Sequence, residues 1–179
     1  MSIETIAIIG AGELGRAWAR RALGVGYRTI LEDVSLSRLE QGAAAIRGLR
    51  SANGAQLVTA SSVAGAVREA DLIIETVSDE LEMKLELFTL FDKFAKPGAI
   101  FASTTNTISV ADLADMTFCP ERCIGMRLGF AGGVELMELV MGPRTAQETV
   151  TRCRDVALRM GLAVRMLPDK PTSSPDDGS

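Results

Sequence analysis

Short apolar runs alternate with stretches of helical periodicity along most of the chain. Residues 5–9 (TIAII) form a continuous apolar run, and the next segment, from Glu13 to about Gly24, places Leu14, Trp18 and Leu23 near one helical face. Alternation of this kind is typical of βαβ units, which build parallel sheets. The pattern predicts an α/β fold, a Rossmann-type doubly wound and mostly parallel sheet, in a single domain over residues 1–170.

The predicted elements follow one another at short intervals. Strands are predicted over residues 5–9, 27–32, 56–59, 71–77, 99–103, 122–126, 137–141 and 163–167, with 137–141 as an edge strand. Helices are predicted over residues 13–24, 35–49, 62–68, 80–95, 109–116 and 145–160. Residues 51–54 are predicted to form a turn. Residues 171–179 are polar and without periodicity, and we expect this tail to be disordered.

Composition narrows the function classes. The net charge is −4 with no basic block, which argues against nucleic acid as a partner. The apolar runs fall far short of the roughly 18 residues that span a membrane, and the N-terminus lacks the pattern of a secretory signal. We therefore expect a cytoplasmic protein. The three cysteines match no zinc pattern, so we expect no metal and reduced thiols partly in the core.

The first strand leads directly into a glycine-rich turn. Residues 10–15 read Gly10-Ala11-Gly12-Glu13-Leu14-Gly15, which is G-x-G-x-x-G at the start of a predicted helix. Gly10 suits the tight turn, Gly12 lets the backbone approach a pyrophosphate, and Gly15 lets helix and strand pack closely. Phosphates then bind the free N–H groups at the positive end of the helix dipole. The segment predicts a dinucleotide site.

An acidic residue follows the second predicted strand at the spacing that this fingerprint requires. Asp33 lies about 20 positions beyond the glycines, where a carboxylate accepts hydrogen bonds from the adenosine ribose and repels a 2′-phosphate. No arginine follows it at once. The cofactor predicted here is therefore NAD, not NADP. The alternative is a glycine turn that serves only the fold and has lost its ligand.

These motifs and several later ones resemble the NAD-binding domain of the 3-hydroxyacyl-CoA dehydrogenases. The resemblance runs from about Ile3 to Lys170. The segments that carry it, besides the glycine turn, are Ile74-Glu75-Thr76-Val77, LEMKLELFTLF from Leu81 to Phe91, IFAS at residues 100–103, Pro120-Glu121-Arg122, Ile124-Gly125-Met126, Glu138-Leu139-Val140 and LPDKP from Leu167 to Pro171.

The resemblance implies further contacts with NAD. It places Thr76 and Val77 beneath the adenine-to-ribose region of NAD, and Asp79 and Lys84 near the nicotinamide ribose. Thr104, in the segment that reads Thr104-Thr105-Asn106-Thr107, falls where relatives contact nicotinamide. For Lys84 the residues alone leave another interpretation open, a solvated charge on a helix surface.

The chain departs from the family at the catalytic residues. The family takes the hydroxyl proton with a His–Glu pair, but this sequence contains no histidine and Arg127 occupies that position. A guanidinium group has no acceptor and stays protonated, so Arg127 cannot be a general base. It can polarise a carbonyl or hold a carboxylate. Glu138 corresponds to the family's glutamate, and Asn106 replaces the serine that binds substrate. A simple ion pair between Arg127 and Glu138 is the alternative.

Two larger differences bear on function. Between Asp33 and Glu75 the chain lacks most of the helical excursion with which the family holds coenzyme A, and it stops soon after Lys170, where relatives begin a helical domain. The family activity should therefore be absent or weak. One hypothesis is an NAD-dependent oxidoreductase with an altered site, using Asn106, Arg127 and Glu138 on a 3-hydroxyacyl-type or smaller substrate.

The second hypothesis is a non-catalytic NAD-binding sensor, scaffold or partner subunit, and the third is a piece of a longer enzyme. The position of Arg127 and Glu138 relative to the nicotinamide end of the cleft should distinguish an active site from a module without one. Without a second domain, apolar Leu128, Phe130 and Val134 should be exposed. We therefore expect a homo-oligomer or a complex with another subunit.

Overall fold

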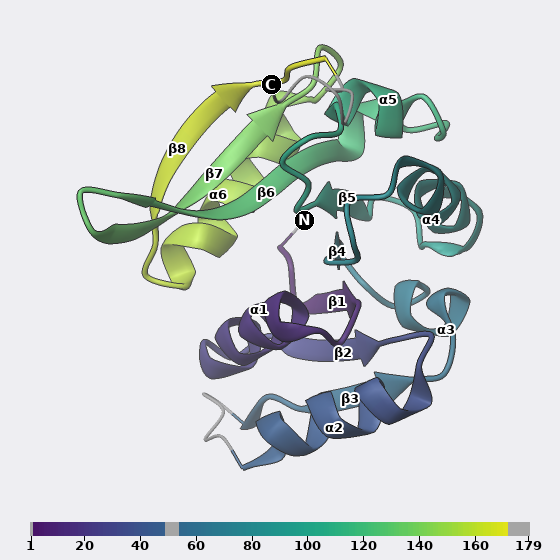
Figure 1. Ribbon diagram of the computed structural model, residues 1–179. Coiled ribbons are helices and arrows are strands. Elements are labelled where there is room, and N and C mark those ends of the chain that lie inside the picture. The colour runs from purple at the N-terminus through teal and green to yellow at the C-terminus, as the bar shows by residue number, and fades with distance from the viewer. Residues whose placement is uncertain (1, 49–53, 172–179) are drawn as a thin grey trace, which may run out of the picture.

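The structure, a computed structural model, describes residues 2–48 and 54–171. Strands and helices alternate along the chain as far as α5 (Figure 1). The elements in chain order are β1 (Thr5–Ile9), α1 (Glu13–Gly24), β2 (Arg28–Glu32), α2 (Leu36–Arg47), β3 (Leu57–Ala60), α3 (Val63–Val67), β4 (Leu72–Glu75), α4 (Leu81–Phe94), β5 (Ile100–Ser103), α5 (Val110–Ala114), the 3₁₀ turn Pro120–Arg122, β6 (Cys123–Ala131), β7 (Val134–Met141), α6 (Gln147–Arg159) and β8 (Ala163–Pro168).

The described strands form one sheet in the order β3-β2-β1-β4-β5-β6-β7-β8. Neighbouring strands are parallel except β6 and β7, which pair antiparallel. From β1 the chain moves outward to β2 and β3, then returns to the other side with β4 and β5. The strand order therefore reverses between β1 and β4, which is where open α/β sheets bind ligands at their carboxyl ends.

Helices cover both faces of the sheet. Helices α1, α2 and α6 bury Trp18, Leu39 and Val156 against one face, and α3, α4 and α5 bury their apolar residues, including Phe88 and Leu113, against the other. The periodicity of each helix supplies the apolar stripe that the sheet needs. This arrangement confirms the predicted Rossmann-type fold.

Most predicted element boundaries agree with the structure to about two residues. The first strand and first helix coincide with their predictions, whereas the strand predicted over 71–77 ends at Glu75. Residues 51–53 of the predicted turn, residue 49 at the predicted end of the second helix, and residues 172–179 of the predicted tail lie outside the described residues.

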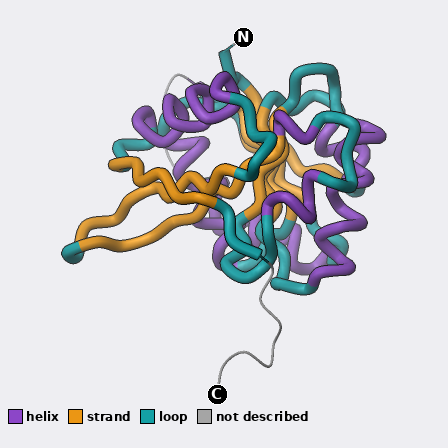
Figure 2. Tube along the Cα trace, turned by 90° about the horizontal axis from the view of Figure 1, so that it is seen from above, coloured by secondary structure: helices purple, strands orange, loops and turns teal. Residues whose placement is uncertain are grey.

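The region around β6 and β7 differs from the prediction. The strand predicted over 122–126 extends to Ala131, and the one predicted over 137–141 begins at Val134. The expectation of an edge strand at 137–141 is wrong, because β8 pairs with the outer side of β7. Gly132 and Gly133 both have positive φ, of 58° and 79°, as a tight hairpin turn requires. Figure 2 shows the resulting hairpin projecting from the body of the molecule.

The three cysteines, Cys119, Cys123 and Cys153, are free and buried. Burial raises the pKa of Cys119 to about 11 and those of Cys123 and Cys153 to about 12. These thiols are core residues, as the sequence predicted, and their thiolate forms are disfavoured. Within the described chain, no helix is both long enough and apolar enough to cross a membrane.

Candidate functional site

The glycine turn between β1 and α1 has the geometry that a dinucleotide requires. Gly10 has a φ of 107°, and its N–H donates to the Glu32 carbonyl oxygen at 2.8 Å. A Cβ atom on Gly15 would lie 1.8 Å from the Gly10 oxygen, whereas one on Gly12 would meet no atom within 4 Å. Gly15 is therefore required for packing. The space at Gly12 opens outward, as the approach of a pyrophosphate demands.

Unpaired backbone donors face this space. Gly12 is the N-cap of α1, no side chain caps the helix, and the first helical hydrogen bond runs from the Arg16 N–H to the Gly12 oxygen at 3.0 Å. The N–H groups of Glu13, Leu14 and Gly15 precede that bond. Three such donors at the positive end of a helix of 12 residues suit the pyrophosphate of NAD.

Asp33, directly after β2, is fixed against the glycine turn. Its Oδ2 accepts from the Ala11 N–H at 2.9 Å and its Oδ1 from the Ser35 N–H at 2.7 Å. Arg38 Nε also donates to Oδ1 at 3.2 Å, in an ion pair that the sequence did not predict. The carboxylate thus lies beside the turn, where an adenosine ribose would meet it.

Thr76 lies beneath the turn. Its hydroxyl group lies 3.1 Å from the carbonyl oxygens of both Ile9 and Gly10, to which it donates, and its N–H donates to Ile9 at 2.8 Å. The side chain therefore holds the glycine turn in place. Val77 follows, half-buried and packed against the cluster of α3 and α4. Both residues directly follow β4, at the carboxyl end of the strand, where open α/β sheets bind ligands.

Asp79 joins the loop after β4 to the loop after β5. Its Oδ2 accepts from the Asn106 N–H and the Thr107 hydroxyl, each at 3.1 Å. Burial acts to raise the pKa of Asp79, but the hydrogen bonds from Asn106 and Thr105 and the charge of Lys84 outweigh it, and the pKa is lowered. Asp79 therefore stays ionised while it positions the loop that carries Asn106.

Lys84 on α4 is fully buried, so the alternative of a solvated helix charge is wrong. Its Nζ lies 2.7 Å from both carboxylate oxygens of Glu75, 3.2 Å from the Val77 carbonyl oxygen and 3.3 Å from Asp79 Oδ1. The Ser103 hydroxyl donates to Glu75 from the other side. This network braces the strand ends that surround the predicted nicotinamide region.

Thr104 is the first residue after β5 and is buried. Its N–H donates to the Glu75 carbonyl oxygen at 3.3 Å, which extends the pairing of β4 with β5 by one residue. The position lies between the Lys84 network and the loop of Asn106. A contact between Thr104 and nicotinamide remains a prediction.

Arg127 and Glu138 are direct partners in the antiparallel pairing of β6 with β7. Arg127 Nε lies 3.3 Å from Glu138 Oε2, and Arg165 of β8 contacts Oε1 of the same carboxylate. The ion pair foreseen as an alternative is therefore present. Arg127 Nε is buried and has no hydrogen-bond acceptor among the described residues, so the contact with Glu138 is one of charge alone. Arg127 Nη1 donates to the Thr105 oxygen at 3.5 Å.

A cavity of about 230 Å³ lies beside this pair. Asn106 and Arg127 line it together with Val140, Leu167 and Lys170, among others. Glu138 does not line it. Arg127 and Asn106 therefore line the same cavity. The position of this cavity relative to the nicotinamide of NAD remains a prediction.

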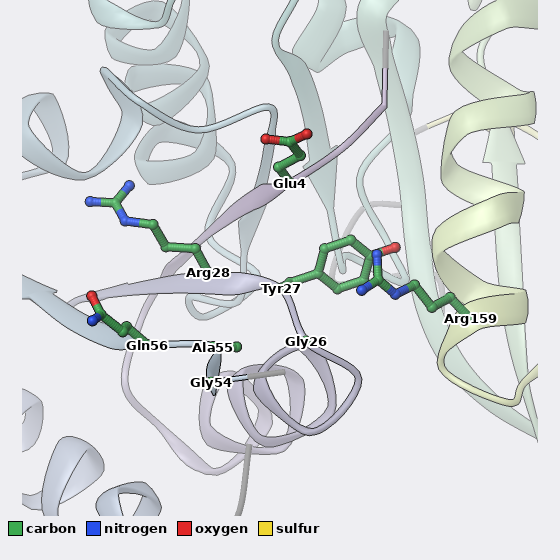
Figure 3. A pocket seen from close by; sticks show the side chains of 8 residues that line it. All are labelled: Glu4, Gly26, Tyr27, Arg28, Gly54, Ala55, Gln56 and Arg159. Carbon is green, nitrogen blue, oxygen red and sulfur yellow. The ribbon is translucent and has the colours of Figure 1, made fainter. Parts of the chain in front are cut away.

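A cavity of about 380 Å³ lies at the opposite edge of the sheet (Figure 3). It is lined by residues at the amino ends of β1, β2 and β3, including Glu4 and Arg28, and by Arg159, whose guanidinium group lies 4.3 Å from the centre of the Tyr27 ring. Open α/β sheets bind ligands at the carboxyl ends of their strands. Despite its size, this cavity lies at the wrong edge for the dinucleotide.

The fold and the glycine turn define a dinucleotide-binding domain of the Rossmann type. A family model described as "3-hydroxyacyl-CoA dehydrogenase, NAD binding domain" matches residues 5–167. The chain therefore belongs to the 3-hydroxyacyl-CoA dehydrogenase family as an NAD-binding domain, and its cofactor is NAD.

Relatives and solved structures agree with this assignment. The chain is 32% identical over 183 residues to a 3-hydroxybutyryl-CoA dehydrogenase of Bradyrhizobium diazoefficiens, covering 94% of this chain and 62% of that protein. It is 33% identical over 177 residues to an L-carnitine dehydrogenase of Burkholderia mallei, covering 93% and 54%. The crystal structure of an Escherichia coli 3-hydroxybutyryl-CoA dehydrogenase superimposes with a TM-score of 0.84 at 27% identity, over 96% of this chain and 39% of that one. This chain thus spans less than two thirds of these relatives.

Proposed function

We propose that this domain serves an oxidoreductase that transfers a hydride between NAD and a 3-hydroxyacyl-type or smaller substrate, with Arg127 in place of the family's basic histidine. The observation that carries the proposal is that Arg127 and Asn106 line one cavity, and that Asn106 lies two residues beyond Thr104, beside which the family resemblance places the nicotinamide. When bound, the cofactor would supply the hydride as NADH or accept it as NAD⁺. A guanidinium group and an amide N–H then offer donors to the substrate oxygen on which negative charge develops.

The geometry favours reduction of a carbonyl group. Arg127 cannot remove a proton from a hydroxyl group, and both oxygens of Glu138 already contact guanidinium groups, those of Arg127 and Arg165. A positively charged donor instead stabilises the alkoxide that forms when a carbonyl accepts a hydride. The proton that completes the alcohol would come from water in the open cavity.

The cavity also suits a substrate with a negative charge. Arg127 and Lys170 line it, and the carboxylate of Asp169, which lines it too, is engaged by the Ser109 hydroxyl and the N–H groups of Val110 and Ala111. Arg127 and Lys170 thus supply two cationic groups to the cavity wall, with Asp169 in the same wall and Glu138 paired with Arg127. We expect a 3-oxo carboxylate to be accepted at least as well as a 3-oxoacyl-CoA thioester.

The test begins with calorimetric titration of NAD, NADH and NADPH, and continues with NADH oxidation by acetoacetate and acetoacetyl-CoA. Arg127→Met should lower turnover by about 10²–10³-fold, the usual effect of losing one oxyanion donor, with little change in NADH affinity. Arg165→Met removes the other guanidinium group on Glu138 but lies outside the cavity, so it should change turnover by less than about threefold. Equal effects of the two variants would contradict a direct role of Arg127.

A non-catalytic NAD-binding module or partner subunit is the second candidate. This candidate is favoured by the two ion pairs of Glu138, because its carboxylate oxygens contact the guanidinium groups of Arg127 and Arg165. Glu138 corresponds to the family's catalytic glutamate. This function predicts micromolar binding of NAD or NADH with no NADH oxidation by any carbonyl compound, and no effect of Arg127→Met on binding.

A further inference from the structure

Glu32, the last residue of β2, is a buried charged residue at the carboxyl edge of the sheet. Ile9 of β1 pairs with Glu32 on one side and with Glu75 on the other, so the three residues form one row at the carboxyl ends of the strands. Because side chains alternate along a strand, Glu32 shares a face with Ile30, whose cluster is covered by α3 and α4. Its side chain is buried, with 4% of the residue exposed.

The two carboxyl groups of this row differ in their partners. Glu75 is buried against Lys84 and Ser103. Among the described residues, by contrast, no hydrogen bond or ion pair involves the Glu32 carboxyl group, and its charged neighbour is Asp33, of the same sign. Burial, followed by the charge of Asp33, raises the pKa of Glu32 to about 7. Burying an unpaired carboxyl group is costly, and an apolar residue would fill this position without that cost.

The position of Glu32 relative to the glycine turn identifies the part of NAD that it would meet. Its carbonyl oxygen accepts from the Gly10 N–H, and the next residue, Asp33, is the candidate ligand of the adenosine ribose. Val77, which the family resemblance places beneath the adenine-to-ribose region, is half-buried and packs on the same face of the sheet as Glu32. The base that the ribose carries therefore lies at this end of the row, and the nicotinamide lies at the other, beyond β4.

We propose that the Glu32 carboxyl group recognises the 6-amino group of the adenine base and makes the site selective for an adenine dinucleotide. A carboxylate offers only acceptors, which suit the two N–H bonds of the 6-amino group. An oxygen in place of the 6-amino group would be unfavourable next to the Glu32 carboxylate, because two acceptors cannot form a hydrogen bond with each other. The proposal concerns the cofactor alone and does not depend on the substrate or on the role of Arg127.

The test compares NAD with its hypoxanthine analogue, in which an oxygen replaces the 6-amino group of the base. Calorimetric titration at pH 8.5, above the pKa of Glu32, should show the wild type binding NAD on the order of tenfold more tightly, as expected for a hydrogen bond to a charged group. Glu32→Gln keeps the size of the side chain but can both accept from the amino group and donate to the oxygen. This variant should bind the two dinucleotides within about twofold of each other.

Two controls separate recognition from a general loss of the site. Asp33→Ala removes the candidate ribose ligand, so it should weaken both dinucleotides by the same factor and keep their ratio. A thermal unfolding curve of Glu32→Gln tests whether the variant is folded. Equal affinity of the wild type for NAD and the analogue, an unchanged preference in Glu32→Gln, or a wild type that does not bind NAD would each overturn the proposal.

Discussion

At the scale of single residues, buried charge is distributed unevenly over this site. Lys84 and Glu75 compensate each other, and Asp33 receives hydrogen bonds from two backbone N–H groups and from Arg38. Glu32, next to Asp33, has no such compensation from the part of the chain that the structure describes. In a cofactor site, uncompensated groups of this kind mark positions where a ligand completes the environment.

Glu32 should also make the stability of the free protein depend on pH. Its pKa in the folded protein, about 7, lies above the ordinary value of 4.5. Its contribution is therefore fully present below pH 4.5 and is lost as pH rises through 7. At ~1.4 kcal/mol per pKa unit, the loss is on the order of 3 kcal/mol. Urea unfolding between pH 4.5 and 8.5 should show this decline in the wild type, whereas Glu32→Gln should lack it. Parallel profiles would contradict the assignment.

Local chemistry predicted some of the site residues better than others. Gly10, Gly12, Gly15 and Asp33 could be found because their roles depend on short-range geometry, a turn and a fixed spacing. The contact between Asp33 and Arg38 was harder to predict from the sequence. Arg38 lies five residues after Asp33, and the orientation of its side chain depends on where α2 begins. The burial of Glu32 had a weaker signal, a charged residue directly after the apolar pair Ile30 and Leu31 at the end of a strand.

At the scale of elements, β4, β5 and α4 depend on one buried network. Lys84 reaches from α4 to Glu75 on β4, and Ser103 on β5 donates to the same carboxylate. Asp79 connects the loop that carries Asn106 to this network, because its carboxylate accepts a hydrogen bond from the Asn106 N–H. The sequence indicated each of these residues, but their association depends on parallel pairing of strands about 28 residues apart. Spacing along the chain does not reveal such contacts.

Removing the cation from this network should destabilise the whole domain. Lys84→Met leaves Glu75 buried without its partner, which typically costs roughly 3–5 kcal/mol. The double variant Lys84→Met with Glu75→Leu removes both charges and should recover most of that loss. Urea unfolding of the wild type and the two variants measures the difference. If Lys84→Met is as stable as the wild type, Lys84 does not compensate Glu75 as the structure indicates.

The hairpin of β6 and β7 shows where sequence patterns were insufficient. Residues 128–133 (LGFAGG) have neither the alternation of a strand nor the polarity of a long loop. They pair because Gly132 and Gly133 permit a tight turn and because Glu135 binds Arg21 of α1. Pairing with distant residues thus decided the length of both strands, and it placed Arg127 opposite Glu138.

At the scale of the whole molecule, the hairpin of β6 and β7 projects from the body of the domain (Figure 2). Phe130 is 71% exposed and Val134 63% exposed, whereas Leu128 is half-buried and packs against the core. The expectation that all three would be exposed is therefore wrong for Leu128. Large exposed apolar side chains near the end of a strand pair are typical of association surfaces.

We expect a second copy of this chain to cover the hairpin. Pairing about a twofold axis would bring Phe130 of each copy against the same face of the other hairpin, which closes the surface without leaving it open to further copies. Sedimentation velocity over a hundredfold range of concentration should show a monomer–dimer equilibrium. Phe130→Ser should weaken the dimer by about thirtyfold, as for loss of an aromatic residue central to an interface. Phe118→Ser is the matched control, because Phe118 is equally large and 98% exposed but lies between α5 and the 3₁₀ turn, away from the hairpin. A monomer at all concentrations, or equal effects of the two variants, would contradict self-association through the hairpin.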